Sequence, residues 1–225
     1  MNIAVIPARG GSKRIPRKNI KKFAGKPMLQ YAIEAAQVAD VFDEIVVSTD
    51  DNEIAEIAKA LGASVPFSRP ANLSDDHTPT VPVIRHAIEQ MHRMEENVSF
   101  VCCIYPTVPF IRSSDLVEAL AKVKDNSDRF CFPVAEFPSS IFRSLKMSEN
   151  CALESVFPEH ELTRSQDLPP AFFDVGQFYW GHSDLWKQSD TVLSLGIGHE
   201  IPYWRAIDID TTADWQRAEL LYGTL

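Results

Sequence analysis

Short β-branched stretches alternate with stretches of helical periodicity along most of this chain, and that alternation leaves few folds open to it. Residues 3–6, 44–49 and 99–105 are mainly apolar and have the length of strands. Over 29–36 and 54–61, apolar residues recur every three or four positions, as on one face of a helix. Strands joined by crossover helices form a mostly parallel sheet covered on both faces. We therefore expect an α/β fold that binds ligands at the carboxyl ends of its strands.

The alternation continues toward the end of the chain. We expect a short strand at 63–67, helices over 83–91 and 116–123, a strand at 176–180, and a strand ending at 206–210 that returns the chain to the sheet. A final helix follows, through Trp215, Ala218 and Leu221.

Several of these helices are preceded by residues that can cap them. Asp50 to Asn52, Ser113 to Asp115, and Thr211 or Thr212 each offer a side-chain oxygen to the first free N–H groups of a helix. Gly62 suits the end of the helix over 54–61.

Helical periodicity is lost between residues 130 and 180, where prolines interrupt short β-like stretches. The prolines are Pro133, Pro138, Pro158, Pro169 and Pro170. We interpret 136–175 as a segment inserted into a single domain that spans 1–225.

Length and composition are those of an ordinary globular protein, with 225 residues of which 45% are hydrophobic and 24% charged. No apolar run approaches the roughly 20 residues that span a bilayer, and the amino terminus lacks a secretory pattern, so we expect a cytoplasmic protein that binds no membrane. The four cysteines show neither metal-type spacing nor a disulfide framework.

The first strand runs into a basic loop with eight Lys and Arg side chains between Arg9 and Lys26 and no acidic residue before Glu34. The whole chain nevertheless has a net charge of -9. Such a chain repels nucleic acid over most of its surface, so one basic loop suits a small polyanion such as a nucleoside triphosphate. A flexible solvated loop and a nucleic-acid patch are the alternatives.

Within this loop, Gly10-Gly11-Ser12 can turn successive N–H groups toward one phosphate, while Arg9, Lys13 and Lys18 neutralise its charge. The spacing is neither that of a Walker A loop nor that of a dinucleotide fingerprint.

A second candidate is Asp208-x-Asp210. On a strand, positions two apart face the same side, so both carboxylates can face one hard cation such as Mg²⁺. The alternative is an ordinary pair of polar residues between a strand and a helix. The loop from Arg69 to Asp76 can recognise a base or ribose, although by itself it is typical of a turn. Arg164 to Asp167 can bind a carboxylate, although such a group is more often an ordinary surface ion pair.

Taken in order, these motifs resemble the cytidylyltransferases that make CMP-sialic acids. The resemblance rests on stretches spread over nearly the whole chain: Ile6 to Lys13 with Pro16-x-Lys18-Asn19, Val47 to Asp50, Arg69-Pro70, Pro106 to Pro109, and Asp208 to Asp210. Cys102 to Pro106, Thr163 to Leu168 and Asp174 to Gly181 are most similar to the branch of this family that acts on pseudaminic acid.

The resemblance implies a Rossmann-like nucleotidyltransferase, usually a homodimer in which the Pro-rich insert completes the partner's site. It also implies a reaction, the transfer of CMP from CTP to the anomeric hydroxyl of a nonulosonic acid with release of pyrophosphate. Mg²⁺ would be held by Asp208 and Asp210.

Other site residues are implied position by position. Catalytic contacts to phosphate would come from Arg9, Lys13 and Lys18, together with Asp208 and Asp210. CTP would be bound by Ala8, Arg9, Gly10, Gly11, Ser12, Lys13, Asn19, Arg69, Asp76 and Thr80. The sugar would be bound by Tyr105, Arg164, Gln166 and Gln177.

Tyr105 departs from the family pattern, because sialic acid enzymes commonly have Gln before the Pro-Thr-Ser-Pro motif that corresponds to Pro106 to Pro109. This departure argues against N-acetylneuraminate, and an aromatic ring can suit the deoxygenated tail of pseudaminic acid, although core or dimer-interface packing is the alternative for such residues. We expect pseudaminic acid as the substrate because the chain resembles that branch of the family. The alternatives are CMP-N-acetylneuraminate or CMP-legionaminate synthesis and, outside enzymes, a nucleotide-binding sensor.

Overall fold

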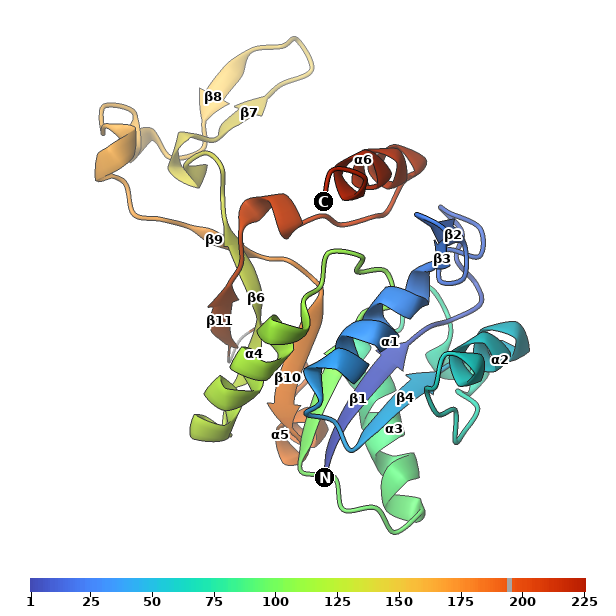
Figure 1. Cartoon of the computed structure of the whole chain (residues 1–225). Helices are drawn as coiled ribbons and strands as arrows, with labels where there is room; N and C mark the ends of the chain where they lie inside the picture. The colour runs from blue at the N-terminus through green and yellow to red at the C-terminus, as the bar shows by residue number, and fades with distance from the viewer. Residues whose placement is uncertain (194–195) are drawn as a thin grey trace.

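A seven-stranded mixed sheet forms the centre of the computed structural model, which describes residues 1–193 and 196–225 (Figure 1). Its strands lie in the order β11-β6-β10-β5-β1-β4, and β9 pairs with β6 outside this path. Their bounds are β1 (Asn2–Pro7), β4 (Glu44–Ser48), β5 (Phe100–Ile104), β6 (Phe130–Glu136), β9 (Phe172–Asp174), β10 (Phe178–His182) and β11 (Gly196–Glu200).

Most neighbouring strands of the path run parallel. β1 pairs in parallel with both β4 and β5, and β11 with β6, whereas β10 lies antiparallel between β5 and β6. The apolar run Ile3 to Ile6 in β1 is wholly buried, as expected for a parallel strand covered on both faces. The predicted mostly parallel α/β fold is confirmed.

Helices cover both faces of the sheet, and the side chains of β1 show the division. Ala4 and Ile6 pack in one core with α1 (Met28–Ala39), α2 (Asn52–Ala60) and α4 (Ser113–Asp125). Ile3 and Val5 point the other way, into a second core with α3 (Thr80–Arg93) and α5 (Ser183–Gln188). Among the described residues, none of the helices combines the length and the apolarity that crossing a bilayer requires.

A third, smaller core lies beside the basic loop. It joins Ile15, Phe23 from the hairpin β2 (Lys22–Phe23) and β3 (Lys26–Pro27), and Trp215 from α6 (Thr212–Tyr222). The first loop of the chain and its last helix therefore pack against each other.

Two of the three predicted caps are confirmed. The Asp51 carboxylate accepts from the Ile54 N–H at 3.0 Å, and Thr211 forms a capping box with Asp214 at the start of α6. The prediction that Ser113 to Asp115 cap α4 is wrong, because Arg112 is the N-cap residue and makes no side-chain cap. Asp115 is buried instead and pairs with a distant arginine.

Two predicted strands are absent from the sheet. The stretch 63–67 forms only isolated parallel bridges, at Ser64 with Val46 and nearby at Ser68 with Thr49. The stretch 206–210 pairs with no strand in the part of the chain that the structure describes, because β11 takes the edge of the sheet and a 3₁₀ turn, η5 (Tyr203–Arg205), then leads the chain away.

The Pro-rich segment 136–175 begins and ends in the sheet, at the end of β6 and at β9, and the residues between them extend away from it (Figure 1). Its elements are η2 (Ile141–Arg143), β7 (Leu145–Met147), β8 (Leu153–Ser155), η3 (Pro158–His160) and η4 (Ser165–Asp167). β7 and β8 form a separate antiparallel ribbon, and the pairing of Glu136 with Phe172 joins the two ends of the segment. We call this segment the arm.

Candidate active site

A cavity of about 450 Å³ opens where β1 and β5 end. Pro7 at the end of β1 and Tyr105 just after β5 both line it, so it lies at the carboxyl ends of parallel strands. Of the site residues predicted from the sequence, the cavity is lined by Arg9, Ser12, Lys13, Lys18, Asn19, Arg69, Asp76, Thr80, Tyr105, Asp208 and Asp210.

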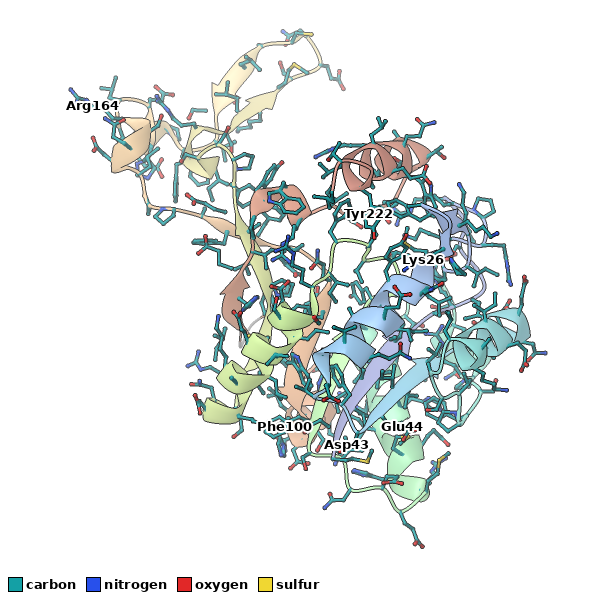
Figure 2. All side chains as sticks on the ribbon, in the orientation of Figure 1. Lys26, Asp43, Glu44, Phe100, Arg164 and Tyr222 are labelled. Atoms are coloured by element: carbon teal, nitrogen blue, oxygen red, sulfur yellow. The ribbon has the colours of Figure 1, made fainter. Side chains whose placement is uncertain are left out.

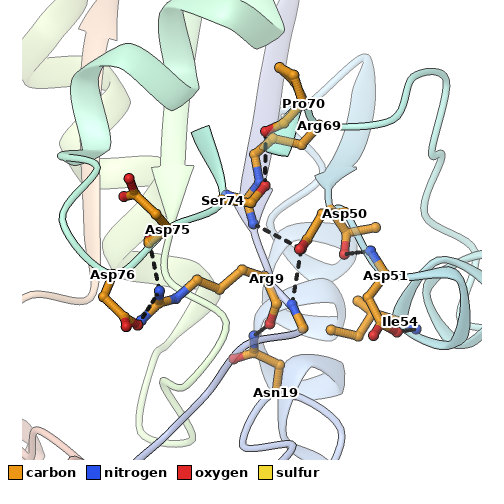
Figure 3. Close-up of polar contacts among 12 residues, drawn as sticks. Arg9, Asn19, Asp50, Asp51, Ile54, Arg69, Pro70, Ser74, Asp75 and Asp76 are labelled. Atoms are coloured by element: carbon orange, nitrogen blue, oxygen red, sulfur yellow. Dashed lines mark hydrogen bonds and ion pairs between the residues drawn. The ribbon is translucent and has the colours of Figure 1, made fainter. Parts of the chain in front are cut away.

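One end of the cavity is held by a cluster around Asp76 (Figure 3). Arg9 Nη1 donates to Asp76 Oδ1 at 2.6 Å and to the backbone oxygen of Asp75 at 2.7 Å. Lys13 pairs with the other oxygen of the Asp76 carboxylate. Hydrogen bonds from Lys13 and Arg9 lower the pKa of Asp76 below its ordinary value.

A second cluster joins the basic loop to the segment before α6. Arg14 Nη1 lies 2.7 Å from Asp210 Oδ2, and Lys18 Nζ donates to the backbone oxygen of Ile209 at 2.8 Å. Arg14 was part of the basic cluster in the sequence but was not assigned to the site, and the structure adds it to the lining. The two motifs from opposite ends of the chain thus share one cavity.

Asp208 and Asp210 both line this cavity although they do not lie on a strand. Burial alternates along the segment, with Ile207 and Ile209 packed into the small core and the aspartates outside it. Partial burial, together with the negative charge of Asp210, raises the pKa of the Asp208 carboxyl. The expected same-side arrangement is therefore produced by packing and not by strand pairing.

Two neighbouring carboxylates are the donors that Mg²⁺ prefers. Within residues 1–193 and 196–225, no group of three or more His, Cys, Asp or Glu side chains has the geometry to hold a metal. A hard cation at Asp208 and Asp210 would thus take its remaining oxygens from a ligand and from water, which fits a magnesium–triphosphate pair.

The loop after β1 owes its shape to close contacts with the loop after β4. The Gly10 N–H donates to Asp50 Oδ1 at 3.0 Å, and Asn19 Nδ2 donates to the Arg9 carbonyl at 2.9 Å (Figure 3). A Cβ atom on Gly10 would lie 2.6 Å from the Asp51 carboxylate. Glycine is therefore required at position 10 for this close approach.

Arg69 lies on the wall of the cavity with only 4% of its surface exposed. Its Nη2 lies 3.8 Å from Asp50 Oδ1, and among the described residues its Nε and Nη2 have no hydrogen-bond partner. Burial lowers the pKa of Arg69. A buried guanidinium with free donors is suited to bind a polar ligand group.

Tyr105 sits on another wall, close to α3 and β10. Its hydroxyl lies 2.7 Å from Thr80 Oγ1, and its ring packs edge-on against Tyr179 with centroids 5.6 Å apart. Tyr179 in turn donates to Asp174 Oδ2 at 2.6 Å. Burial raises the pKa of Tyr105 to about 12, so its phenol stays neutral at physiological pH.

Some predicted site residues lie outside this lining. Ala8 is fully buried, and Gly10 and Gly11 are not among the lining residues. Arg164 and Gln166 lie on the arm, where Figure 2 labels Arg164, and Gln166 lines a second cavity of about 620 Å³ at the base of the arm. Gln177 is buried, with 2% of its surface exposed.

Comparison with known proteins agrees with this geometry. The family model described as cytidylyltransferase matches residues 3–184. The chain belongs to this family. The resemblance predicted from the motifs is thereby confirmed.

Individual cytidylyltransferases are similar over nearly the whole chain. Pseudaminic acid cytidylyltransferase from Campylobacter jejuni subsp. jejuni serotype O:2 is 41% identical over 222 residues, covering 98% of this chain and 96% of that protein. CMP-N,N'-diacetyllegionaminic acid synthase from Legionella pneumophila is 31% identical over 228 residues, covering 97% of this chain and 95% of that protein.

A solved structure supports the fold. CMP:2-keto-3-deoxy-manno-octonic acid synthetase complexed with CTP superposes with a TM-score of 0.72, covering 99% of this chain and 98% of its own, at 18% identity. The same α/β architecture thus occurs at low sequence identity.

Proposed function

We propose that this cytidylyltransferase transfers CMP from CTP to the anomeric hydroxyl of pseudaminic acid and releases pyrophosphate. The observation that carries the proposal is the meeting of the basic loop with Asp208 and Asp210 in one cavity. The substrate class follows the 41% identical pseudaminic acid cytidylyltransferase of Campylobacter jejuni, whose sequence aligns almost end to end.

Phosphate binding is assigned to the basic loop. Arg9, Lys13 and Lys18 line the cavity, and the backbone of Gly10 to Ser12 curves beside them. In-line transfer needs chiefly correct positioning and neutralisation of the charge that develops on the leaving pyrophosphate. These cations meet that need without a side-chain nucleophile.

Asp208 and Asp210 are the residues that would hold Mg²⁺. The chemistry supplied by that ion is neutralisation of phosphate charge and alignment of the triphosphate. Arg14 and Lys18 both pair with the Asp210 carboxylate, and all three residues line the cavity.

The cytidine is assigned to the wall formed by Asn19, Arg69, Asp76 and Thr80. Arg69 has two buried donors, Nε and Nη2, without a hydrogen-bond partner among the described residues, and Asp76 and Thr80 line the same cavity. A site with buried donors rejects ligands that cannot accept from them.

We assign sugar binding to the cavity wall at Tyr105. In a dimer, Arg164 and Gln166 on the arm of the second copy would complete that binding site. The arm exposes large apolar side chains, among them Leu162 at 100%, Met147 at 68% and Leu153 at 59%. Exposed apolar side chains gathered on a projecting segment mark a surface for association. A homodimer is therefore part of the proposal, and we also propose that it works in the cytoplasm, as expected from the sequence.

The test is release of pyrophosphate from CTP with Mg²⁺ and a panel of pseudaminate, legionaminate, N-acetylneuraminate and ketodeoxyoctonate. We expect the highest kcat/KM with pseudaminate. Preference for legionaminate would favour the activity named for the Legionella pneumophila relative. CTP binding with no product from any sugar would replace the enzyme by a nucleotide-binding sensor.

A further inference from the structure

Within residues 1–193 and 196–225, no strand pairs with the segment that bears Asp208 and Asp210, and side-chain contacts hold it instead. On the buried side of the segment, Ile207 and Ile209 pack into the small core. Lys18 donates to the Ile209 carbonyl. Two further contacts, both buried, act at Arg205, where the segment begins.

The first contact comes from Gln177. Its Nε2 donates to the Arg205 carbonyl at 2.9 Å, while its own backbone oxygen accepts from the Tyr105 N–H at 2.9 Å. Gln177 therefore connects the cavity wall at Tyr105 to the start of the segment. Its side chain is 2% exposed and does not line the cavity. Nε2 makes this link, whereas Oε1 is buried without a hydrogen-bond partner among the described residues.

The second contact comes from the Arg205 side chain, which is 3% exposed. Its Nη1 and Nη2 donate to the two oxygens of Asp115 at 2.5 and 3.2 Å. His199 Nε2 lies 3.3 Å from the same carboxylate. Burial by itself would raise the pKa of Asp115, but the hydrogen bonds from His199 and Arg205 outweigh it and the pKa is lowered.

A buried, two-point ion pair of this kind fixes direction as well as distance, because both partners are planar. It secures Arg205 to the first turn of α4, while Gln177 holds the carbonyl of the same residue. Arg205, where the segment begins, is thus restrained at both its side chain and its backbone carbonyl.

We infer that Gln177 and the Asp115–Arg205 pair are positioning residues that aim Asp208 and Asp210 at the metal and triphosphate. The inference rests on the proposed function. It gives Gln177 a role at the phosphate end of the reaction, where the family resemblance had implied contact with the sugar.

Gln177→Met tests the role of the amide, since it keeps the length of the side chain but removes the donor to Arg205. Partners that orient ligands typically change metal affinity by about 10- to 100-fold when removed. We therefore expect the Mg²⁺ concentration for half-maximal activity to rise at least about tenfold. The KM for the sugar should stay near the wild-type value.

Mn²⁺ binding to the enzyme–CTP complex, followed by electron paramagnetic resonance, gives a readout without turnover. Gln177→Met should weaken Mn²⁺ binding by a factor similar to the rise in the Mg²⁺ concentration for half-maximal activity. Gln37→Met is the matched control, since Gln37 also donates an amide N–H to a backbone oxygen, at Leu61, far from the cavity. It should leave both readouts unchanged. A raised sugar KM with unchanged Mn²⁺ binding would overturn the inference.

Arg205→Lys and Arg205→Met test the ion pair. Lys keeps the charge opposite Asp115 but loses the two-point geometry, so Arg205→Lys should retain part of the Mn²⁺ affinity. Arg205→Met removes the charge as well and should show the full loss of affinity. Equal Mn²⁺ affinity in wild type and both folded variants would contradict the role of the pair. The Mn²⁺ titrations also separate the two proposals: a wild type that binds CTP and Mn²⁺ without releasing pyrophosphate rejects the proposed function alone.

Discussion

The Lys18 ammonium lies 2.8 Å from the backbone oxygen of Ile209, which is 191 positions further along the chain. This contact places the basic loop next to the two aspartates. The two motifs line one cavity, and the proposed reaction with CTP and Mg²⁺ depends on that juxtaposition.

Arg9→Ala should lower kcat/KM severely. Arg9 donates to Asp76 and Asp75 beside the predicted triphosphate position, and a charge-assisted donor in such a site contributes roughly 3 kcal/mol to the transition state. Steady-state pyrophosphate release measures the loss. Arg93→Ala, in the exposed last turn of α3, is the control. An unchanged kcat/KM in Arg9→Ala would exclude Arg9 from the reaction.

Gly10→Ala should weaken CTP binding far more than Gly11→Ala does. A Cβ atom at position 10 would collide with Asp51, whereas nothing lies within 4 Å of a Cβ atom at position 11. The collision displaces the loop that carries Arg9 and Lys13. Calorimetric titration with CTP compares the pair, and equal affinities would show that the close packing against Asp51 is unimportant.

Asp51→Asn removes the ion pair between Asp51 and Arg17. It should reduce the free energy of unfolding at neutral pH by roughly 1 kcal/mol, the upper end of the range for partly exposed ion pairs. Hydrogen bonding to Arg17 lowers the pKa of Asp51 to about 2, while Asn can still cap α2. Because the folded pKa is depressed, this stabilisation is present above the unfolded value and is lost as pH falls toward 2.

Urea unfolding of wild type and Asp51→Asn at a series of pH values measures this difference. The two curves should converge between about pH 4 and pH 2. A difference that stays constant with pH would mean that the ion pair with Arg17 contributes nothing to stability.

The arm should be required for dimer formation. Leu153→Glu introduces a charge on an exposed arm residue, so we expect a monomer with unchanged folding by light scattering and circular dichroism. Val38→Glu is the control, because Val38 is an exposed apolar residue on α1, outside the arm. A dimer that survives Leu153→Glu and forms as well as the Val38→Glu dimer would place the interface elsewhere.

If the arm completes a partner's site, inactive variants should complement each other. Arg164→Ala and Asp208→Asn alone should both have little activity. Mixed after unfolding and refolding, they should recover about a quarter of wild-type activity, since half the dimers carry one intact site of two. No recovery from a mixture shown to contain mixed dimers would assign Arg164 to its own chain's site or to none.

Local patterns in the sequence were sufficient for much of the fold. The apolar run Ile3 to Ile6, the helical spacing after it, and the caps at Asp51 and Thr211 each depend on residues a few positions apart. The basic loop was recognisable for the same reason, since its charges are contiguous. These features require no knowledge of distant partners.

Tertiary structure decided what depends on pairing across the chain. Asp115 resembles a helix cap in sequence, yet it is buried opposite Arg205, 90 positions away, because a buried carboxylate needs a partner. The stretch 206–210 looks like a strand, yet β11 occupies the edge of the sheet. The sequence thus determined the α/β fold and the chemistry of its motifs. Only long-range packing determined that Asp208 and Asp210 face the basic loop, since no local pattern encodes which distant contacts hold that segment.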